Sequence, residues 1–264
     1  MATYRETFAA LGRAALVPFF VIGDPDYDTS LALVKTAIDA GADILELGIP
    51  FSDPIADGPT IQKADIRALA AGMTPARALE FIGRVTAYRA IPVGLLVYYN
   101  LVWHYGVERF FRDFAAVGGS SVLVADLSID DEEEIGPAAR AAGLETVYMV
   151  TPNTTDERAR RIAAKTTGFI YTVSTLGVTG TRETLSDMVR PLVERLKAMT
   201  SVPVCVGFGI SNAEQARQVA AAGADGVIIG SRIVRIIEDN LADRDKMKRE
   251  VAEFVRGVRG VLER

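Results

Sequence analysis

Eight short runs of apolar residues recur along the chain, each followed by a polar loop and an amphipathic segment. The runs are nearly continuous rather than alternating, which is typical of strands whose two faces are both buried in a parallel sheet. Strands are therefore expected at 17–22, 43–48, 92–98, 121–125, 144–150, 168–173, 202–207 and 226–230. The intervals between them predict a series of eight βα units.

The amphipathic segments between these runs predict helices, for example Ser30–Gly41 and Asn212–Gly223. The sequence AGAD precedes two of the expected strands, at Ala40 and again at Ala222. Helix caps need a side-chain acceptor at the start and often a left-handed glycine at the end. The residues expected in these positions are Thr29 or Ser30, Asn212, Gly41, Gly143 and Gly223.

This repeating order predicts an α/β fold, a single-domain (β/α)8 TIM barrel over residues 1–264. An extra N-terminal helix and an inserted helix near Ile61–Ala71, after the second strand, complete the expected fold. The alternative is a doubly wound open sheet, which carries a glycine-rich fingerprint after its first strand. The sequence there is GDPDYD (Gly23–Asp28), which lacks that fingerprint, so the barrel is favoured.

Composition narrows the function. The 264 residues carry 29 Lys and Arg against 34 Asp and Glu, a net charge of −5, so the basic surface of a nucleic-acid-binding protein is missing. One cysteine, Cys205, and one histidine, His104, exclude a disulfide framework and multi-cysteine or multi-histidine metal sites. The apolar stretch Ala14–Ile22 is too short to span a membrane and is interrupted by Pro18. A cytoplasmic protein is expected.

Two carboxylates stand out as candidate catalytic groups. Glu46 lies inside an expected buried strand, where an ionised side chain is unfavourable unless it is paired or functional. Asp57 lies in the loop that follows. A structural role remains open for both, because a buried carboxylate can bind loop amides, and Pro54 and Gly58 mark this loop as a turn.

Glycines after the last strands suggest a phosphate site. Segments 207–211 and 230–231 both follow strands and precede helices, where backbone amides can approach phosphate oxygens. The long loop Thr175–Ser186 is either a connector or a lid over the substrate. All lysines fall in helical or terminal segments, which excludes a Schiff-base lysine on a strand. Cys205 is expected in the core, and Trp103 and His104 in a surface or packing loop.

Several motifs together resemble the α subunit of tryptophan synthase, over nearly the whole chain. They are LELGIPFSDPIADGPTIQ (Leu45–Gln62), GLLVYYNLV (Gly94–Val102), VLVADL (Val122–Leu127), GVTG followed by Arg182, and GFGIS (Gly207–Ser211). The resemblance implies retro-aldol cleavage of indole-3-glycerol phosphate to indole and glyceraldehyde 3-phosphate, without metal or organic cofactor. It also implies a pyridoxal-phosphate β subunit as partner, in an α2β2 complex.

The resemblance assigns roles to individual residues. Glu46 matches the acid/base carboxylate, Asp57 the group that binds the indole nitrogen, and Tyr171 a tyrosine of the active site. The other matching positions are Gly180, Gly209, Gly230 and Ser231 for phosphate, Phe19, Leu96, Tyr98 and Phe208 for the indole ring, and Thr179 and Arg182 in the lid. The face around Pro50, Asp53 and Asn100 is expected to dock on the β subunit.

The sequence departs from the family pattern at Ser128, often proline, and at Lys63 and Asp65, where amides associated with the partner contact are usual. Two alternatives to the main prediction are a stand-alone lyase that releases free indole and a non-catalytic regulatory subunit. Indole-glycerol-phosphate synthase, another phosphate-binding barrel, relies on strand lysines that this chain lacks. A sugar-phosphate isomerase is a further alternative.

Overall fold

A computed structural model describes residues 3–173, 185–207 and 209–262 of the chain. In these residues nine strand segments form one parallel sheet, in the order β5-β4-β3-β2-β1-β9-β8-β7-β6. The segments are β1 (Ala15–Val21), β2 (Leu45–Gly48), β3 (Val93–Val97), β4 (Ser121–Val124), β5 (Glu145–Thr146), β6 (Tyr148–Val150), β7 (Ile170–Val173), β8 (Val204–Gly207) and β9 (Gly226–Ile229).

The ends of this sheet meet in a single interrupted strand. β5 pairs with β4 and β6 pairs with β7, and only Val147 separates the two segments. The sheet is therefore an eight-stranded barrel, and the predicted (β/α)8 fold is confirmed. Each strand falls within the predicted apolar run or begins two residues before it.

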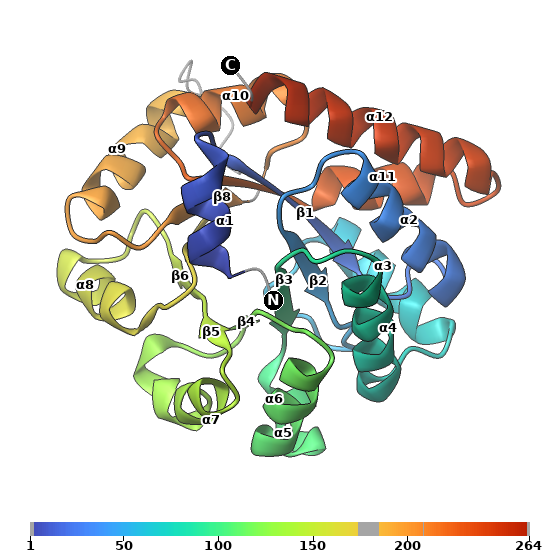
Figure 1. Ribbon diagram of the computed structural model, residues 1–264, viewed down its shortest axis with the longest axis horizontal. Helices are drawn as coiled ribbons and strands as arrows, with labels where there is room; N and C mark the ends of the chain where they lie inside the picture. The colour runs from blue at the N-terminus through green and yellow to red at the C-terminus, as the bar shows by residue number, and fades with distance from the viewer. Residues whose placement is uncertain (1–2, 174–184, 208, 263–264) are drawn as a thin grey trace.

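Helices surround the barrel (Figure 1). They are α1 (Tyr4–Leu11), α2 (Tyr27–Asp39), α3 (Pro59–Ala70), α4 (Pro75–Tyr88), α5 (Tyr99–Tyr105), α6 (Val107–Ala116), the 3₁₀ helix η1 (Ile129–Glu134), α7 (Gly136–Ala141), α8 (Asp156–Lys165), α9 (Leu185–Lys197), α10 (Ala213–Ala221), α11 (Ser231–Asp239) and α12 (Arg244–Leu262). The predicted N-terminal and inserted helices are α1 and α3. None of the helices in the described part of the chain is long and apolar enough to cross a membrane.

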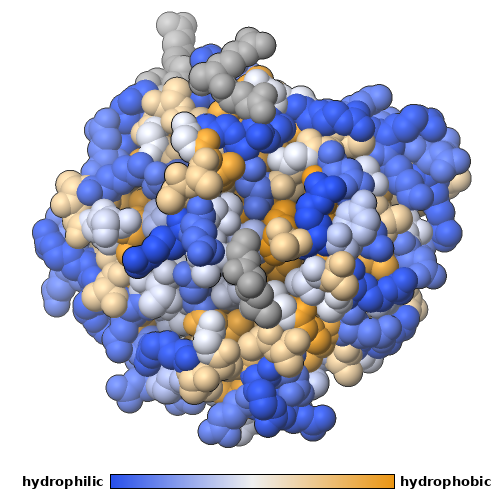
Figure 2. Space-filling model, viewed as in Figure 1, coloured by the Kyte–Doolittle hydropathy of each residue, from blue (hydrophilic) through white to orange (hydrophobic). Residues whose placement is uncertain are grey.

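Helix α1 closes the amino end of the barrel. Its side chain Tyr4 is 1% exposed, and the Tyr4 hydroxyl lies 2.9 Å from the Ser121 hydroxyl at the start of β4. Gly94 leaves room for this hydroxyl, because a Cβ at that position would collide with it. Figure 1 shows α1 lying across the middle of the ring, and Figure 2, in the same view, shows mainly hydrophilic residues along the outer edge of the molecule and hydrophobic patches toward its centre. The opposite, carboxyl end is left for a binding site.

The two AGAD repeats have the same structural role. Asp43 accepts a hydrogen bond from the Leu16 amide (2.8 Å), and Asp225 accepts one from the Val204 amide (2.8 Å). Each aspartate thus links the start of its own strand to the neighbouring strand. Arg13 and Lys197 pair with the remaining oxygens of these carboxylates.

Most of the predicted helix ends are confirmed. Asn212 caps α10, and Gly41, Gly143 and Gly223 have positive φ angles of 108°, 75° and 95°. The predicted cap of α2 was wrong. Asp26 caps this helix by accepting from the Thr29 amide, so the helix begins at Tyr27 and includes both residues proposed as caps.

The strand and helix positions also settle three minor predictions. Cys205 is buried in β8, as expected, and all six lysines lie in helices. Trp103 and His104 lie at the surface, but on the short helix α5 rather than in a loop.

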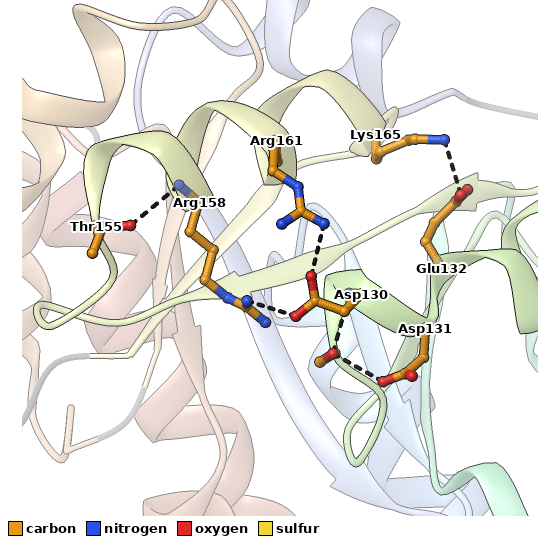
Figure 3. Close-up of polar contacts among 8 residues, drawn as sticks. Asp130, Asp131, Glu132, Thr155, Arg158, Arg161 and Lys165 are labelled. Carbon is orange, nitrogen blue, oxygen red and sulfur yellow. Dashed lines mark hydrogen bonds and ion pairs between the residues drawn. The ribbon is translucent and has the colours of Figure 1, made fainter.

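The acidic segment after β4 is tied to helix α8 (Figure 3). Asp130 accepts from Arg158 Nη1 and Arg161 Nη2, both at 2.7 Å, and Glu132 accepts from Lys165 Nζ at 3.0 Å. Ser128 caps η1 through a bond from the Asp130 amide to its hydroxyl. The departure at Ser128 therefore supplies a helix cap where a proline would have no hydroxyl.

Candidate active site

A cavity that is open to solvent is lined by residues of the barrel strands and of the segments that follow them. Its lining residues are Phe19, Glu46, Asp57, Ile61, Leu96, Tyr171, Gly209, Ile210, Ile228, Gly230 and Ser231. Eight of these positions were predicted site residues, so the fold brings together groups that are far apart in sequence. The predicted residues Phe208, Thr179, Gly180 and Arg182 lie outside the described residues.

Glu46 is a deeply buried carboxyl group of the cavity. It lies on β2, is 4% exposed, and its Oε2 atom has no hydrogen-bond partner. Burial, followed by the negative charge of Asp57, raises the pKa of Glu46 to about 8. At neutral pH this carboxyl group is therefore mainly protonated.

Asp57 lies in a more polar setting. The Tyr98 hydroxyl donates a hydrogen bond of 2.7 Å to Asp57 Oδ2, which stabilises the carboxylate. Burial raises the pKa of Asp57, and the bond from Tyr98 lowers it. The Asp57 backbone oxygen accepts from Gln62 Nε2 at 2.8 Å, which fixes the loop to α3. The two carboxyl groups of the cavity thus have different surroundings, because Asp57 accepts from the Tyr98 hydroxyl and Glu46 Oε2 has no hydrogen-bond partner.

Tyr98 does not line the cavity, although it was expected in the indole pocket. Its ring stacks on Phe51, with centroids 5.1 Å apart and an interplanar angle of 26°. Its hydroxyl also accepts a 3.1 Å bond from the Ala56 amide. Tyr98 therefore lies behind Asp57 and holds the acidic loop, residues 49–58 between β2 and α3, in place.

The apolar wall depends on close packing around Phe19, which pairs in register with Glu46. Gly48 and Gly230 flank its ring, and a Cβ at either position would come within 2.9 Å of it. Ile61, Ile210 and Ile228 complete the wall, and the sequence did not single them out. In a strand buried on both faces, such as that of Ile228, the inward side chains look like their neighbours, so the pattern carries no signal.

Tyr171, on β7, places a phenol beside the carboxylates. It is 4% exposed, and burial raises its pKa well above the ordinary value, so the hydroxyl keeps its proton. The hydroxyl occupies the space next to Gly207, where any Cβ would collide with it. A glycine at the end of β8 is thus required by Tyr171.

The phosphate candidates lie where α11 begins. Gly230 precedes this helix without any side-chain cap, and Ser231 is its first residue, so the first amides of α11 are available to an anion. Gly209 has a φ angle of 74°. Among the described residues, no lysine or arginine lines the cavity. An anion here would be held by backbone amides and hydroxyl groups.

Replacing Gly209 by alanine is expected to raise KM about tenfold for a phosphorylated substrate, because the Cβ disfavours the positive φ and crowds the cavity. Steady-state kinetics would measure this change. Gly223→Ala is the matched control, since its φ is 95° at a helix end that does not line the cavity. An equal rise in KM for both variants would contradict a role in anion binding.

The structure shows the surroundings of two residues that depart from the family pattern, Lys63 and Asp65. Lys63 Nζ pairs with Glu238 at 2.9 Å on the surface of α3. Asp65 is 4% exposed, so its side chain is not available at the surface for contact with a partner.

The residues that the structure describes contain no cluster of three or more His, Cys, Asp or Glu side chains able to hold a metal ion.

A closed parallel barrel with two carboxyl groups in a cavity at its carboxyl end defines an α/β-barrel enzyme. Residues 6–262 match the family model described as tryptophan synthase alpha chain. A tryptophan synthase alpha chain from Methanothermobacter thermautotrophicus is 47% identical over 252 residues, covering 96% of this chain and 93% of the relative. The chain therefore belongs to the tryptophan synthase alpha chain family.

Solved structures agree with this assignment. Tryptophan synthase subunit alpha from Legionella pneumophila superposes with a TM-score of 0.91 at 31% identity, covering 100% of this chain and 99% of that one. A chain from the tryptophan synthase α2β2 complex of Pyrococcus furiosus superposes with a TM-score of 0.87 at 37% identity, covering 94% and 98%.

Proposed function

We propose that this chain is a carbon–carbon lyase that cleaves indole-3-glycerol phosphate to indole and glyceraldehyde 3-phosphate, with Glu46 and Asp57 carrying the reaction. The observation that carries the proposal is the buried Glu46 carboxyl group, whose Oε2 atom has no hydrogen-bond partner, in the same cavity as Asp57. A regulatory subunit without activity would have no need of such a group, which is unfavourable for folding when it ionises.

The reaction moves one proton from the side-chain hydroxyl of the substrate to carbon 3 of the indole ring. Protonated Glu46 first donates its proton to carbon 3, while the Asp57 carboxylate stabilises positive charge at the ring N–H. The Glu46 carboxylate formed in this step then accepts the hydroxyl proton as the carbon–carbon bond breaks. Glu46 returns to its protonated form, and no external acid or base is consumed.

The remaining groups of the cavity position the substrate. The apolar side chains of Phe19, Leu96 and Ile228 provide a surface for the indole ring. Gly209, Gly230 and Ser231 receive the phosphate near the first turn of α11. Tyr171 lines the same cavity as both carboxyl groups, and its hydroxyl can bind the glycerol chain.

The activity is expected to show a bell-shaped dependence on pH. The alkaline limb should have an apparent pKa near 8, because activity is lost as the Glu46 proton required for the first step dissociates. The acid limb should lie above 3.8, because Asp57 must be ionised and burial raises its pKa. Measurement of kcat/KM between pH 4 and 10 checks both limbs. A value of kcat/KM that is constant between pH 7 and 9 would contradict a reaction that starts from protonated Glu46.

The partner is expected to be a pyridoxal-phosphate β subunit in an α2β2 complex, since indole is neutral and easily lost by diffusion. The docking face includes Pro50 and Asp53, in the loop that also carries Asp57, and Asn100, on α5 after β3. Because this substrate and this partner require no membrane, we expect the enzyme to act in the cytoplasm.

Indole release measured with and without a β subunit tests the function. The β subunit should raise the rate, and a substrate analogue should tighten β binding by the same factor by which β tightens analogue binding. Indole release without any effect of β would favour a stand-alone lyase. The absence of indole under both conditions would reject the proposal.

A further inference from the structure

Helix α3 follows the acidic loop directly and is bound to Asp57. Its side chain Gln62 donates from Nε2 to the Asp57 backbone oxygen at 2.8 Å, and its side chain Ile61 lines the cavity. The Ile61 and Gln62 amides both donate to the Gly58 backbone oxygen at 3.0 Å, so the helix begins one residue after Asp57 ends its turn. The position of Asp57 therefore depends on the position of α3.

Apolar packing holds α3 less firmly than it holds the next helix along the chain. In α3, whose residues are all described, the buried residues are Ile61, Ala64, Asp65 and Ala68, so Ile61 is the one large apolar side chain among them. The apolar side chains Ile66 and Leu69 are 67% and 36% exposed. By comparison, α4 buries Leu79, Phe81, Ile82 and Val85. A helix that buries so little apolar surface needs a further contact to fix its position.

An ion pair between Arg67 and Asp24 provides this contact. Arg67, in the last turn of α3, donates from Nε at 2.6 Å and from Nη2 at 2.9 Å to the two carboxylate oxygens of Asp24. Asp24 is 1% exposed and follows the carboxyl end of β1, where the Gly23 amide donates to Ser30 Oγ of α2 at 3.0 Å. Two parallel charge-assisted bonds fix direction as well as distance, so they attach α3 to a rigid part of the barrel.

We infer that Asp24 and Arg67 are positioning residues for the lyase reaction, which place Asp57 by fixing helix α3 to the carboxyl end of β1. This inference rests on the proposed function of Asp57. Neither residue is among the described residues that line the cavity, so the pair acts through α3 and through the Gln62 bond to the Asp57 backbone. Misplacement of a reacting group by about 1 Å can lower a rate about 100-fold, so a smaller shift of α3 is expected to lower kcat about tenfold.

Removing both partners of the pair separates a positioning role from a structural one. Arg67→Met leaves Asp24 buried without its partner, so it should lower stability, and it should also lower kcat about tenfold with less than a threefold change in KM. Asp24→Leu/Arg67→Met leaves no buried charge unpaired, so its stability should return toward that of wild type while kcat stays about tenfold low. Arg67→Lys keeps the charge without the parallel bonds and should lose about threefold in kcat.

Steady-state indole release measures kcat and KM, and urea unfolding measures stability. A wild-type kcat in the Asp24→Leu/Arg67→Met variant would overturn the inference, because a merely structural pair affects activity only through stability. If Arg67→Met does not fold, the double variant and Arg67→Lys still provide this test.

Arg13→Met is the matched control. Arg13 also forms two parallel bonds, of 2.8 and 2.7 Å, with the two carboxylate oxygens of Asp43, and both side chains are 11% exposed. This pair lies before β2, at the amino end of the barrel, away from the cavity. Arg13→Met should lower stability and leave kcat of the folded protein unchanged. An equal loss of kcat in Arg13→Met and Arg67→Met would overturn the inference.

A double-mutant cycle tests whether the pair acts through Asp57. In an Asp57→Asn background, the additional changes Asp24→Leu and Arg67→Met should lower kcat less than twofold further. Fully additive losses would show that the pair does not act on Asp57. Failure of the proposed function is distinct, because the wild-type chain would then release no indole.

Discussion

Replacing Glu46 by glutamine is expected to lower kcat for indole release by at least about 100-fold, because the amide cannot exchange the proton that the reaction moves. The same substitution should stabilise the protein at alkaline pH. The folded-state pKa of Glu46 is raised to about 8 from an ordinary value of 4.5. Between these values the folded chain binds more protons than the unfolded chain, so the wild-type free energy of unfolding falls as pH rises.

Glutamine cannot ionise, so the Glu46→Gln variant lacks this decrease in the free energy of unfolding with rising pH. The free energy of unfolding of Glu46→Gln, relative to wild type, should therefore increase between pH 4.5 and 8, by an amount on the order of 2–4 kcal/mol. Urea unfolding at several pH values measures it. Glu145→Gln is the matched control, since burial also raises the pKa of Glu145 but this residue lies at the amino end of the barrel. It should change the pH dependence of stability and leave kcat unchanged.

A folded Glu46→Gln variant with near-wild-type activity would show that another group moves the proton. Loss of activity together with a loss of stability at pH 8 would show that Glu46 is a structural carboxylate. The paired measurement thus separates the catalytic role from the structural role that the sequence left open.

Asp57→Asn is expected to lower kcat about 100-fold with a small change in KM, because a neutral amide cannot stabilise charge that develops at the ring nitrogen. Tyr98→Phe should have an intermediate effect of about tenfold, since it removes one hydrogen bond to the carboxylate but keeps the charge. Single-turnover measurements on the isolated chain would report these changes directly.

Asp53→Asn is the control for Asp57→Asn, because Asp53 lies in the same loop, is exposed and does not line the cavity. Measured without a β subunit, it should behave as wild type. An equal loss of activity in both aspartate variants would indicate that the net charge of the loop matters and that contact of Asp57 with the substrate does not.

The strand pattern and the single carboxylate within it were readable from the sequence, because burial on both faces leaves a continuous apolar run. Glu46 interrupts such a run and is therefore visible. The AGAD repeats were visible too, but their common role appeared only when Asp43 and Asp225 were seen to bind neighbouring strands. The cap of α2 was placed at the wrong residue because Asp26, Thr29 and Ser30 all have suitable side chains, and local sequence does not choose among them.

Which side chains meet in the cavity was decided only by closure of the barrel. Tyr98 was expected against the substrate, yet its hydroxyl binds Asp57. Asp65, one of the departures from the family pattern, is buried at 4% exposure, which its polar side chain did not indicate. Ile61, Ile210 and Ile228 became cavity walls only once three separate segments met. Hydrophobic periodicity reports whether a residue is buried, which depends on nearby sequence. The side chain that lies opposite it depends on contacts between distant segments, and these are fixed only when the parallel strands close into a ring.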